Sequence, residues 1–127
     1  MKTINQTYVI KATPKEIWRA LVDPDHIEVW SGGKAKMSDK QGVPFELWDG
    51  DIYGTNLEVV TNKKLVQEWY GGDWDKPSKV TFVLTALGPE QTQVALLHEN
   101  VPDKEAHDIE DGWKRYYLGE IKKYLEQ

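Results

Sequence analysis

The chain has 127 residues, a net charge of −5 at pH 7 and no cysteine. This length suggests one domain, residues 1–127, that is large enough to bury a hydrophobic core. The absence of cysteine excludes disulfides, a thiolate nucleophile and a cysteine metal site. Charges of both signs are mixed along the chain, so no basic face points to nucleic acid as a partner. No apolar run approaches the roughly 20 residues that span a bilayer and no signal-peptide pattern is present, so we expect no membrane insertion and a cytoplasmic location.

The N-terminal part predicts one strand followed by two short helices. Residues 2–11 alternate between apolar and polar side chains, as a half-buried strand does. In Thr13-Pro14-Lys15-Glu16, threonine and glutamate have the spacing of a capping box and proline suits the first helical position. Asp23 and Pro24 repeat the start signal directly afterwards. We therefore expect two short helices that run back to back.

The middle of the chain predicts strands joined by turns. Asp49-Gly50 is a strong hairpin signal, and alternation is clearest in residues 78–87 and 92–98. A loop over residues 71–77 holds Trp74. The expected strands, about six in number, cover residues 32–37, 43–47, 51–61, 65–70, 78–87 and 92–98.

Residues 103–127 predict one long amphipathic helix that begins with Asp103 as its N-cap. At about 100° per residue, its broad inner face consists of Ala106, Ile109, Trp113, Tyr116, Tyr117, Ile121 and Tyr124, with Glu120 near the middle. Gly112 and Gly119 each cost roughly 1 kcal/mol relative to alanine in a helix. Both glycines and the inward carboxylate favour a helix that covers a cavity rather than a solid core.

This order of elements predicts an α+β helix-grip fold, in which an antiparallel sheet with one dry face is covered by the terminal helix. The chain also has six tryptophans and six tyrosines. A small domain with so many large aromatic residues is either very well packed or lines a large apolar pocket.

An ordered set of short motifs covers nearly the whole chain. They are Ala12-Thr13-Pro14, Ile17-Trp18, Ala20-Leu21, Asp23-Pro24, Trp30, Gly50, Gly54, Leu57-Glu58-Val59-Val60, Leu65-Val66, Trp69, Val80-Thr81-Phe82, Thr92, Val94, Leu96, His98, Gly112-Trp113 and Tyr124-Leu125-Glu126. Together they resemble the heat-shock protein 90 ATPase activator homologue family of the START-like, birch-pollen-allergen-like SRPBCC superfamily. The resemblance implies an antiparallel sheet of about seven strands, curved around the C-terminal helix, with an internal cavity between them. The eukaryotic chaperone activators carry an additional N-terminal domain, which we expect this chain to lack.

The residues expected to line the cavity come from the second short helix, the strands and hairpins of the sheet, and the terminal helix. They are Trp30, Trp48, Tyr53, Trp69, Phe82, Leu84, Leu96, His98, Trp113, Tyr116, Tyr117 and Glu120. For most of the aromatic residues, plain core packing is the competing interpretation. His98 is either a hydrogen-bonded histidine at a strand end or a polar group at the cavity mouth. A metal set of His98, Glu99, His107 and Asp108 matches no known ligand spacing, and we expect no cofactor or catalytic group.

Three functions remain open from the sequence. The first is binding of a hydrophobic or amphipathic small molecule between sheet and helix. The second is a protein-interaction module that binds a chaperone through the acidic start of the terminal helix and the Trp74 loop. The third is a cyclase- or hydrolase-type enzyme with His98 or a cavity carboxylate as general base.

Overall fold

Seven antiparallel strands form one sheet in the computed structural model, which describes residues 1–72 and 74–127. The strand order is β1-β7-β6-β5-β4-β3-β2. The strands are β1 (Lys2–Ile10), β2 (Ala35–Lys36), β3 (Pro44–Leu47), β4 (Ile52–Val60), β5 (Lys64–Gly71), β6 (Ser78–Gly88) and β7 (Gln91–Val101). The helical segments are α1 (Pro14–Val22), α2 (Pro24–Ser31), α3 (Ala106–Gly112), η1 (Trp113–Tyr117) and α4 (Leu118–Leu125).

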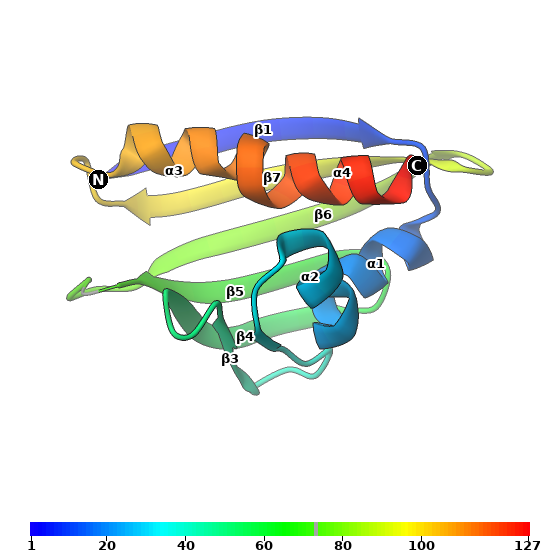
Figure 1. Cartoon of the computed structure of the whole chain (residues 1–127). Coiled ribbons are helices and arrows are strands. Elements are labelled where there is room, and N and C mark those ends of the chain that lie inside the picture. The colour runs from blue at the N-terminus through cyan, green and yellow to red at the C-terminus, as the bar shows by residue number, and fades with distance from the viewer. Residues whose placement is uncertain (73) are drawn as a thin grey trace.

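The helices cover one face of this sheet. Figure 1 shows the C-terminal helical segment running beside β1 and β7, with α1 and α2 in front of β4 and β5. The predicted α+β helix-grip fold is therefore confirmed. The loop predicted over residues 71–77 includes Asp73, which lies outside the described residues.

The two short helices begin where the sequence predicts. The Thr13 hydroxyl accepts a hydrogen bond from the Glu16 amide at 3.2 Å, and the Glu16 carboxylate accepts one from the Thr13 amide at 3.1 Å. The Asp23 carboxylate caps α2 by accepting from the Asp25 amide at 2.9 Å. Helix α2 then ends at Gly32, whose φ of 77° lies in the left-handed region that favours glycine.

Strand boundaries differ from the sequence prediction by more than one residue at two places. The strand expected over residues 32–37 is reduced to β2, because only two residues pair with β3. The Ala35 amide donates instead to the Glu28 carboxylate at 3.1 Å. Strand β7 continues beyond the predicted end at His98, since its pairing with β1 extends to Val101.

The terminal helix begins later than predicted and contains a π-helical turn. Asp103 is not its N-cap: the Asp103 carboxylate binds the N-terminal amine at 2.9 Å, and this contact lowers the pKa of the Asp103 carboxyl. The helix begins at Ala106, after Glu105. Over Trp113–Tyr117 the backbone widens, so that the Leu118 amide bonds to the Trp113 carbonyl, five residues back.

The π-helical turn changes which side chains face the sheet. A π turn takes one residue more than an α turn, so every residue after it is rotated by about 100° relative to a straight α-helix. Tyr116, expected on the inner face, is 65% exposed, while Leu118, expected elsewhere, is fully buried. Glu120 is only partly buried and makes no hydrogen bond within the described part of the chain. The expected inward direction of Tyr116 is therefore wrong, and Leu118 occupies an inner position that the periodicity did not assign to it.

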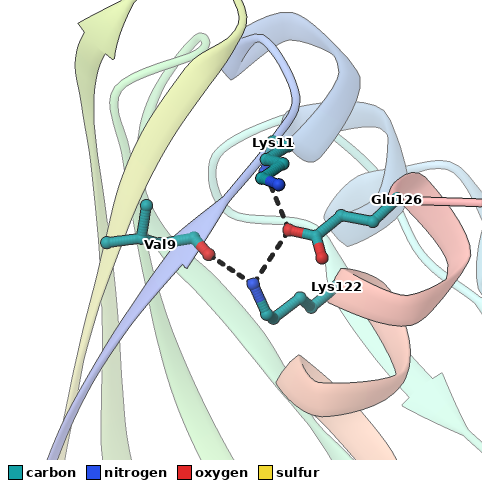
Figure 2. Close-up of polar contacts among 4 residues, drawn as sticks. All are labelled: Val9, Lys11, Lys122 and Glu126. Atoms are coloured by element: carbon teal, nitrogen blue, oxygen red, sulfur yellow. Dashed lines mark hydrogen bonds and ion pairs between the residues drawn. The ribbon is translucent and has the colours of Figure 1, made fainter.

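Side chains from the C-terminal helix also cover the outer edge of β1. The Lys122 ammonium donates to the Val9 carbonyl at 2.7 Å and pairs with Glu126 at 2.8 Å, while Glu126 accepts from the Lys11 amide at 2.9 Å (Figure 2). These contacts lower the pKa of the Glu126 carboxyl, chiefly through the Lys122 hydrogen bond. Farther along the strand, the side-chain amide of Gln6 donates to the backbone carbonyl of Glu110 at 2.8 Å. The helix is therefore fixed at both ends to an edge strand.

Candidate functional site

Aromatic rings fill most of the space between the helix and the sheet. Trp113 of η1 lies at the centre, with its ring centroid 4.6 Å from that of Tyr117, 4.8 Å from Trp69 and 5.6 Å from Phe82. Trp30 packs against Tyr117 at 5.0 Å from the other side. All five side chains are buried. The interior of this helix-grip fold is therefore packed with aromatic side chains rather than left as a large open chamber.

A directed chain of hydrogen bonds runs through the centre of this cluster. The Trp113 indole N–H, which can only donate, donates to Nδ1 of His98 at 3.0 Å. Nε2 of His98 must then carry the proton and donate to the Ser78 hydroxyl at 2.8 Å, which in turn donates to the Trp69 carbonyl at 3.0 Å. Every polar side-chain atom in this series of hydrogen bonds has a partner, so the aromatic cluster is held in one arrangement.

The His98 imidazole is neutral, and both of its ring nitrogens are hydrogen-bonded. Burial lowers its pKa to about 4, because the charged form would lose its hydration. Both ring nitrogens are engaged in hydrogen bonds, so neither is free to take a proton from a substrate. This geometry favours the interpretation of His98 as a hydrogen-bonded histidine over that of a general base.

A second series of buried hydrogen bonds begins at Trp69 and is not predicted from the sequence. The Trp69 indole N–H donates to Gln67 at 3.0 Å, and the Gln67 amide donates to Asn56 at 3.0 Å. Asn56 then donates to the Ser38 carbonyl at 2.7 Å. Strict alternation along β5 would have placed Gln67 on the same face as Leu65 and Trp69, and this is the signal that could have found it.

A small apolar pocket remains beside the aromatic cluster, at the α3 end of the helix. It has a volume of about 180 Å³ and is lined by Ile52, Trp69, Asp108, Ile109, Gly112, Trp113 and Tyr117. An adjoining pocket of about 260 Å³ shares Ile52, Trp69 and Ile109 and extends to Trp74 and Glu105. We call the two together the Ile109 groove. The Trp74 indole N–H donates to the Glu105 carboxylate, which joins the loop after β5 to the start of the helix.

The structure brings only part of the predicted site together. Trp69, Trp113 and Tyr117 line the Ile109 groove, whereas Trp30, Phe82 and His98 pack behind them. Leu84 and Leu96 are buried core residues that line neither part of the groove.

The remaining predicted residues lie elsewhere. Trp48 is partly buried, packs against Tyr117 and donates to the Ser31 hydroxyl at 2.9 Å. Tyr53 is 38% exposed and stacks on Tyr70 at 5.2 Å, on the sheet face opposite to that of Ile52. The expectation that Tyr53 faces the cavity is therefore wrong, because the alternation along β4 directs Ile52 inward instead. Tyr116 is exposed and Glu120 is half-buried, and neither lines the Ile109 groove.

The remaining chemistry of the described residues is limited. Among residues 1–72 and 74–127, no three histidine, aspartate or glutamate side chains gather closely enough to hold a metal ion. In the same part of the chain, no helix is both long enough and apolar enough to cross a membrane.

A sheet curved around a C-terminal helix, with short helices after the first strand, defines a START-like helix-grip protein of the SRPBCC superfamily. Residues 11–126 match the family described as "Activator of Hsp90 ATPase homolog 1-like protein". The chain belongs to that family.

Similar proteins carry related names. An "Activator of 90 kDa heat shock protein ATPase homolog" from Dictyostelium discoideum is 27% identical over 123 residues, which cover 95% of this chain and 32% of that protein. A human "Activator of 90 kDa heat shock protein ATPase homolog 1" is 24% identical and is covered over 35% of its length. The chain therefore spans about a third of the length of these curated relatives. The crystal structure of an HSP90 activator from Plasmodium falciparum superposes with a TM-score of 0.91 at 25% identity, covering 99% of this chain and 97% of the other.

Proposed function

We propose that this chain binds an Hsp90-type chaperone in the cytoplasm and stimulates its ATPase activity, with residues 1–127 acting as one domain. The observation that carries the proposal is the similarity to the Plasmodium falciparum HSP90 activator, which extends over nearly the full length of both chains. The packed aromatic interior also supports it, because a chamber for a large ligand would leave the space between helix and sheet open. Binding to a partner at the surface needs no such chamber.

The Ile109 groove and its acidic border form the surface that best suits such a partner. The groove is apolar and opens beside Trp74, and Glu105 and Asp108 stand at its edge. A buried apolar anchor with a polar border is the usual anatomy of a protein interface. We therefore propose that an apolar side chain of the chaperone enters the groove and that basic groups of the chaperone face the acidic border.

Purified protein added to a purified Hsp90 should raise the rate of ATP hydrolysis, and the complex should be recovered in a pull-down. Ile109→Asp places a charge in the groove and should reduce the stimulation at least tenfold, because that charge would be buried against the partner. The matched control is Tyr116→Asp, at an exposed position on the same helix but outside the groove. Circular dichroism would establish that both variants fold.

Three results would contradict this proposal. The first is an unchanged ATPase rate together with no recovered complex for the unmodified chain. The second is a folded Ile109→Asp variant that stimulates as well as the original, which would place the interface elsewhere. The third is an equal loss of stimulation in Tyr116→Asp, which would mean that charge alone disturbs the contact.

A second candidate function is binding of a small apolar molecule in the 180 Å³ part of the groove. Its walls are almost entirely apolar, with Ile52, Ile109 and three aromatic rings. This volume is below the roughly 300–1,000 Å³ of most ligand sites, so it suits a single ring or a short aliphatic chain rather than a lipid. Native mass spectrometry of the purified protein would test this candidate. A spectrum that shows only the mass of the bare chain, with and without added small aromatics, would count against it.

A further inference from the structure

A second, larger pocket lies away from the Ile109 groove and shares none of its lining residues. It has a volume of about 540 Å³ and is open to solvent between α1, residues 37–39 and the turn at residues 61–62. We call it the α1 pocket. One face of α1 forms its wall, because Lys15, Trp18, Arg19 and Val22 recur at helical spacing and all line it.

Trp18, in the wall of the α1 pocket, carries a hydrogen-bond donor that has no acceptor. Trp18 lines the pocket with a side chain that is only 4% exposed. Its indole N–H is buried and is the one such side-chain atom in the described part of the chain without a hydrogen-bond partner. A buried donor without a partner is unfavourable, because it has lost its hydrogen bonds to water and gained none in the protein. By contrast, the indole N–H groups of Trp30, Trp48, Trp69 and Trp113 all donate to protein oxygen or nitrogen atoms.

Further donors surround this tryptophan. Lys15 and Arg19 stand one helical turn apart on either side of it, and among residues 1–72 and 74–127 neither forms an ion pair. The Ser38 hydroxyl accepts from the Lys40 amide at 3.1 Å, so its own proton remains available. The Asn62 side chain, at the turn after β4, also lines the pocket. Two cations and three neutral donors therefore border one concavity.

Two carboxylates also line the pocket and restrict what it can hold. Asp23 uses one carboxylate oxygen to cap α2, and Asp39 is exposed in the loop after β2. Their charges balance those of Lys15 and Arg19, so the lining as a whole has no net positive charge to attract a polyanion such as nucleic acid. A single compact anionic group can contact the two cations on the α1 side, while Val22 and Met37 offer an apolar wall to the rest of the ligand.

We propose that the α1 pocket binds a small organic anion, in which a carboxylate or phosphate group is carried on an apolar body. The anionic oxygens pair with Lys15 and Arg19, and a small displacement of the pocket wall on binding lets one of them accept from the buried Trp18 indole N–H. The apolar body lies against Val22 and Met37. This site is separate from the proposed chaperone contact and does not depend on it.

The proposal is tested by titrating ¹⁵N-labelled protein with three probes of similar shape: benzoate, phenyl phosphate and the neutral benzyl alcohol. The indole N–H resonance that disappears in Trp18→Phe is that of Trp18. Benzoate or phenyl phosphate should shift it in a saturable manner, and the stronger of the two identifies the anionic group. Benzyl alcohol should leave it in place. The double variant Lys15→Gln/Arg19→Gln should weaken binding at least tenfold.

The matched control is Lys79→Gln/Lys104→Gln, which removes the same charge at two exposed positions outside the pocket. Unchanged affinity in this control, with the loss confined to the α1 variant, supports the proposal. It is overturned if neither anion binds more tightly than about 10 mM, if benzyl alcohol shifts the resonance equally, or if both double variants lose affinity alike. A saturable shift of other resonances with no change at Trp18 would overturn the assignment of the site.

Discussion

Acidification from pH 7 to pH 4 is expected to lower the free energy of unfolding by about 3 kcal/mol through His98 alone. Burial lowers the pKa of His98 from 6.5 to about 4 in the folded protein, whereas the unfolded chain keeps the ordinary value. As the pH falls below about 6.5, the unfolded state therefore gains a proton that the folded state cannot take. This contribution to stability is complete above pH 6.5 and decreases until the folded histidine also titrates. Urea unfolding at a series of pH values measures it.

The variant His98→Gln separates this effect from the carboxylates. Glutamine does not titrate, but it can still accept from Trp113 and donate to Ser78. The variant should be less stable than the original at pH 7, because glutamine does not reproduce the imidazole geometry, yet its stability should fall less steeply between pH 6.5 and pH 4. Asp103 and Glu126, whose pKa values are lowered, contribute to acid lability equally in both proteins. Parallel stability curves over this range would show that His98 is not a source of the pH dependence.

Replacement of Gly119 by alanine is expected to destabilise the protein by about 2 kcal/mol or more, while the same change at Gly112 should stabilise it. A Cβ built at Gly119 would lie 1.7 Å from the Lys114 carbonyl oxygen, a backbone atom that cannot move without disturbing the π-helical turn. At Gly112 the backbone is helical and nothing lies within 4 Å of the added carbon, so alanine should gain up to about 1 kcal/mol of helix propensity.

Thermal and urea unfolding would measure the stability of Gly112→Ala and Gly119→Ala, in which the same change is made before and after the π-helical turn. Opposite signs are the expected result. If Gly119→Ala were as stable as the original, the π-helical turn would not depend on this glycine. A destabilised Gly112→Ala would show instead that the 180 Å³ pocket, which Gly112 lines, does not tolerate a methyl group.

Much of the fold could be predicted because its signals are local. The capping box at Thr13, the cap at Asp23 and the alternation in β6 and β7 depend on neighbouring residues alone, and all appear in the structure. The family motifs then supplied the number of strands and the position of the terminal helix. These features carry no information on how tightly the space between sheet and helix is filled.

The candidate site was predicted less well because one backbone irregularity controls it. Periodicity assumes a constant rotation per residue, so it assigned Tyr116 and Glu120 to the inner face and missed Leu118. Helix propensity alone marks Gly119 as unfavourable. The reason for a glycine at this position is the Lys114 carbonyl, which leaves no room for a Cβ, and this close approach is not visible in the sequence. The pairing of Trp74 with Glu105 likewise joins residues that are distant along the chain.

The contacts between the C-terminal helix and β1 also affect how copies of this protein can associate. Exposed strand edges are the usual starting points for domain swapping and amyloid-like growth. Here Lys122 occupies the Val9 carbonyl on one outer strand, and the strand at the opposite border of the sheet, β2, pairs over only two residues. The helix therefore lies against the β1 border, and the β2 border consists of a strand of only two residues. A strand added from a second molecule would have to displace the Lys122 side chain at β1, or pair with a strand of only two residues at β2.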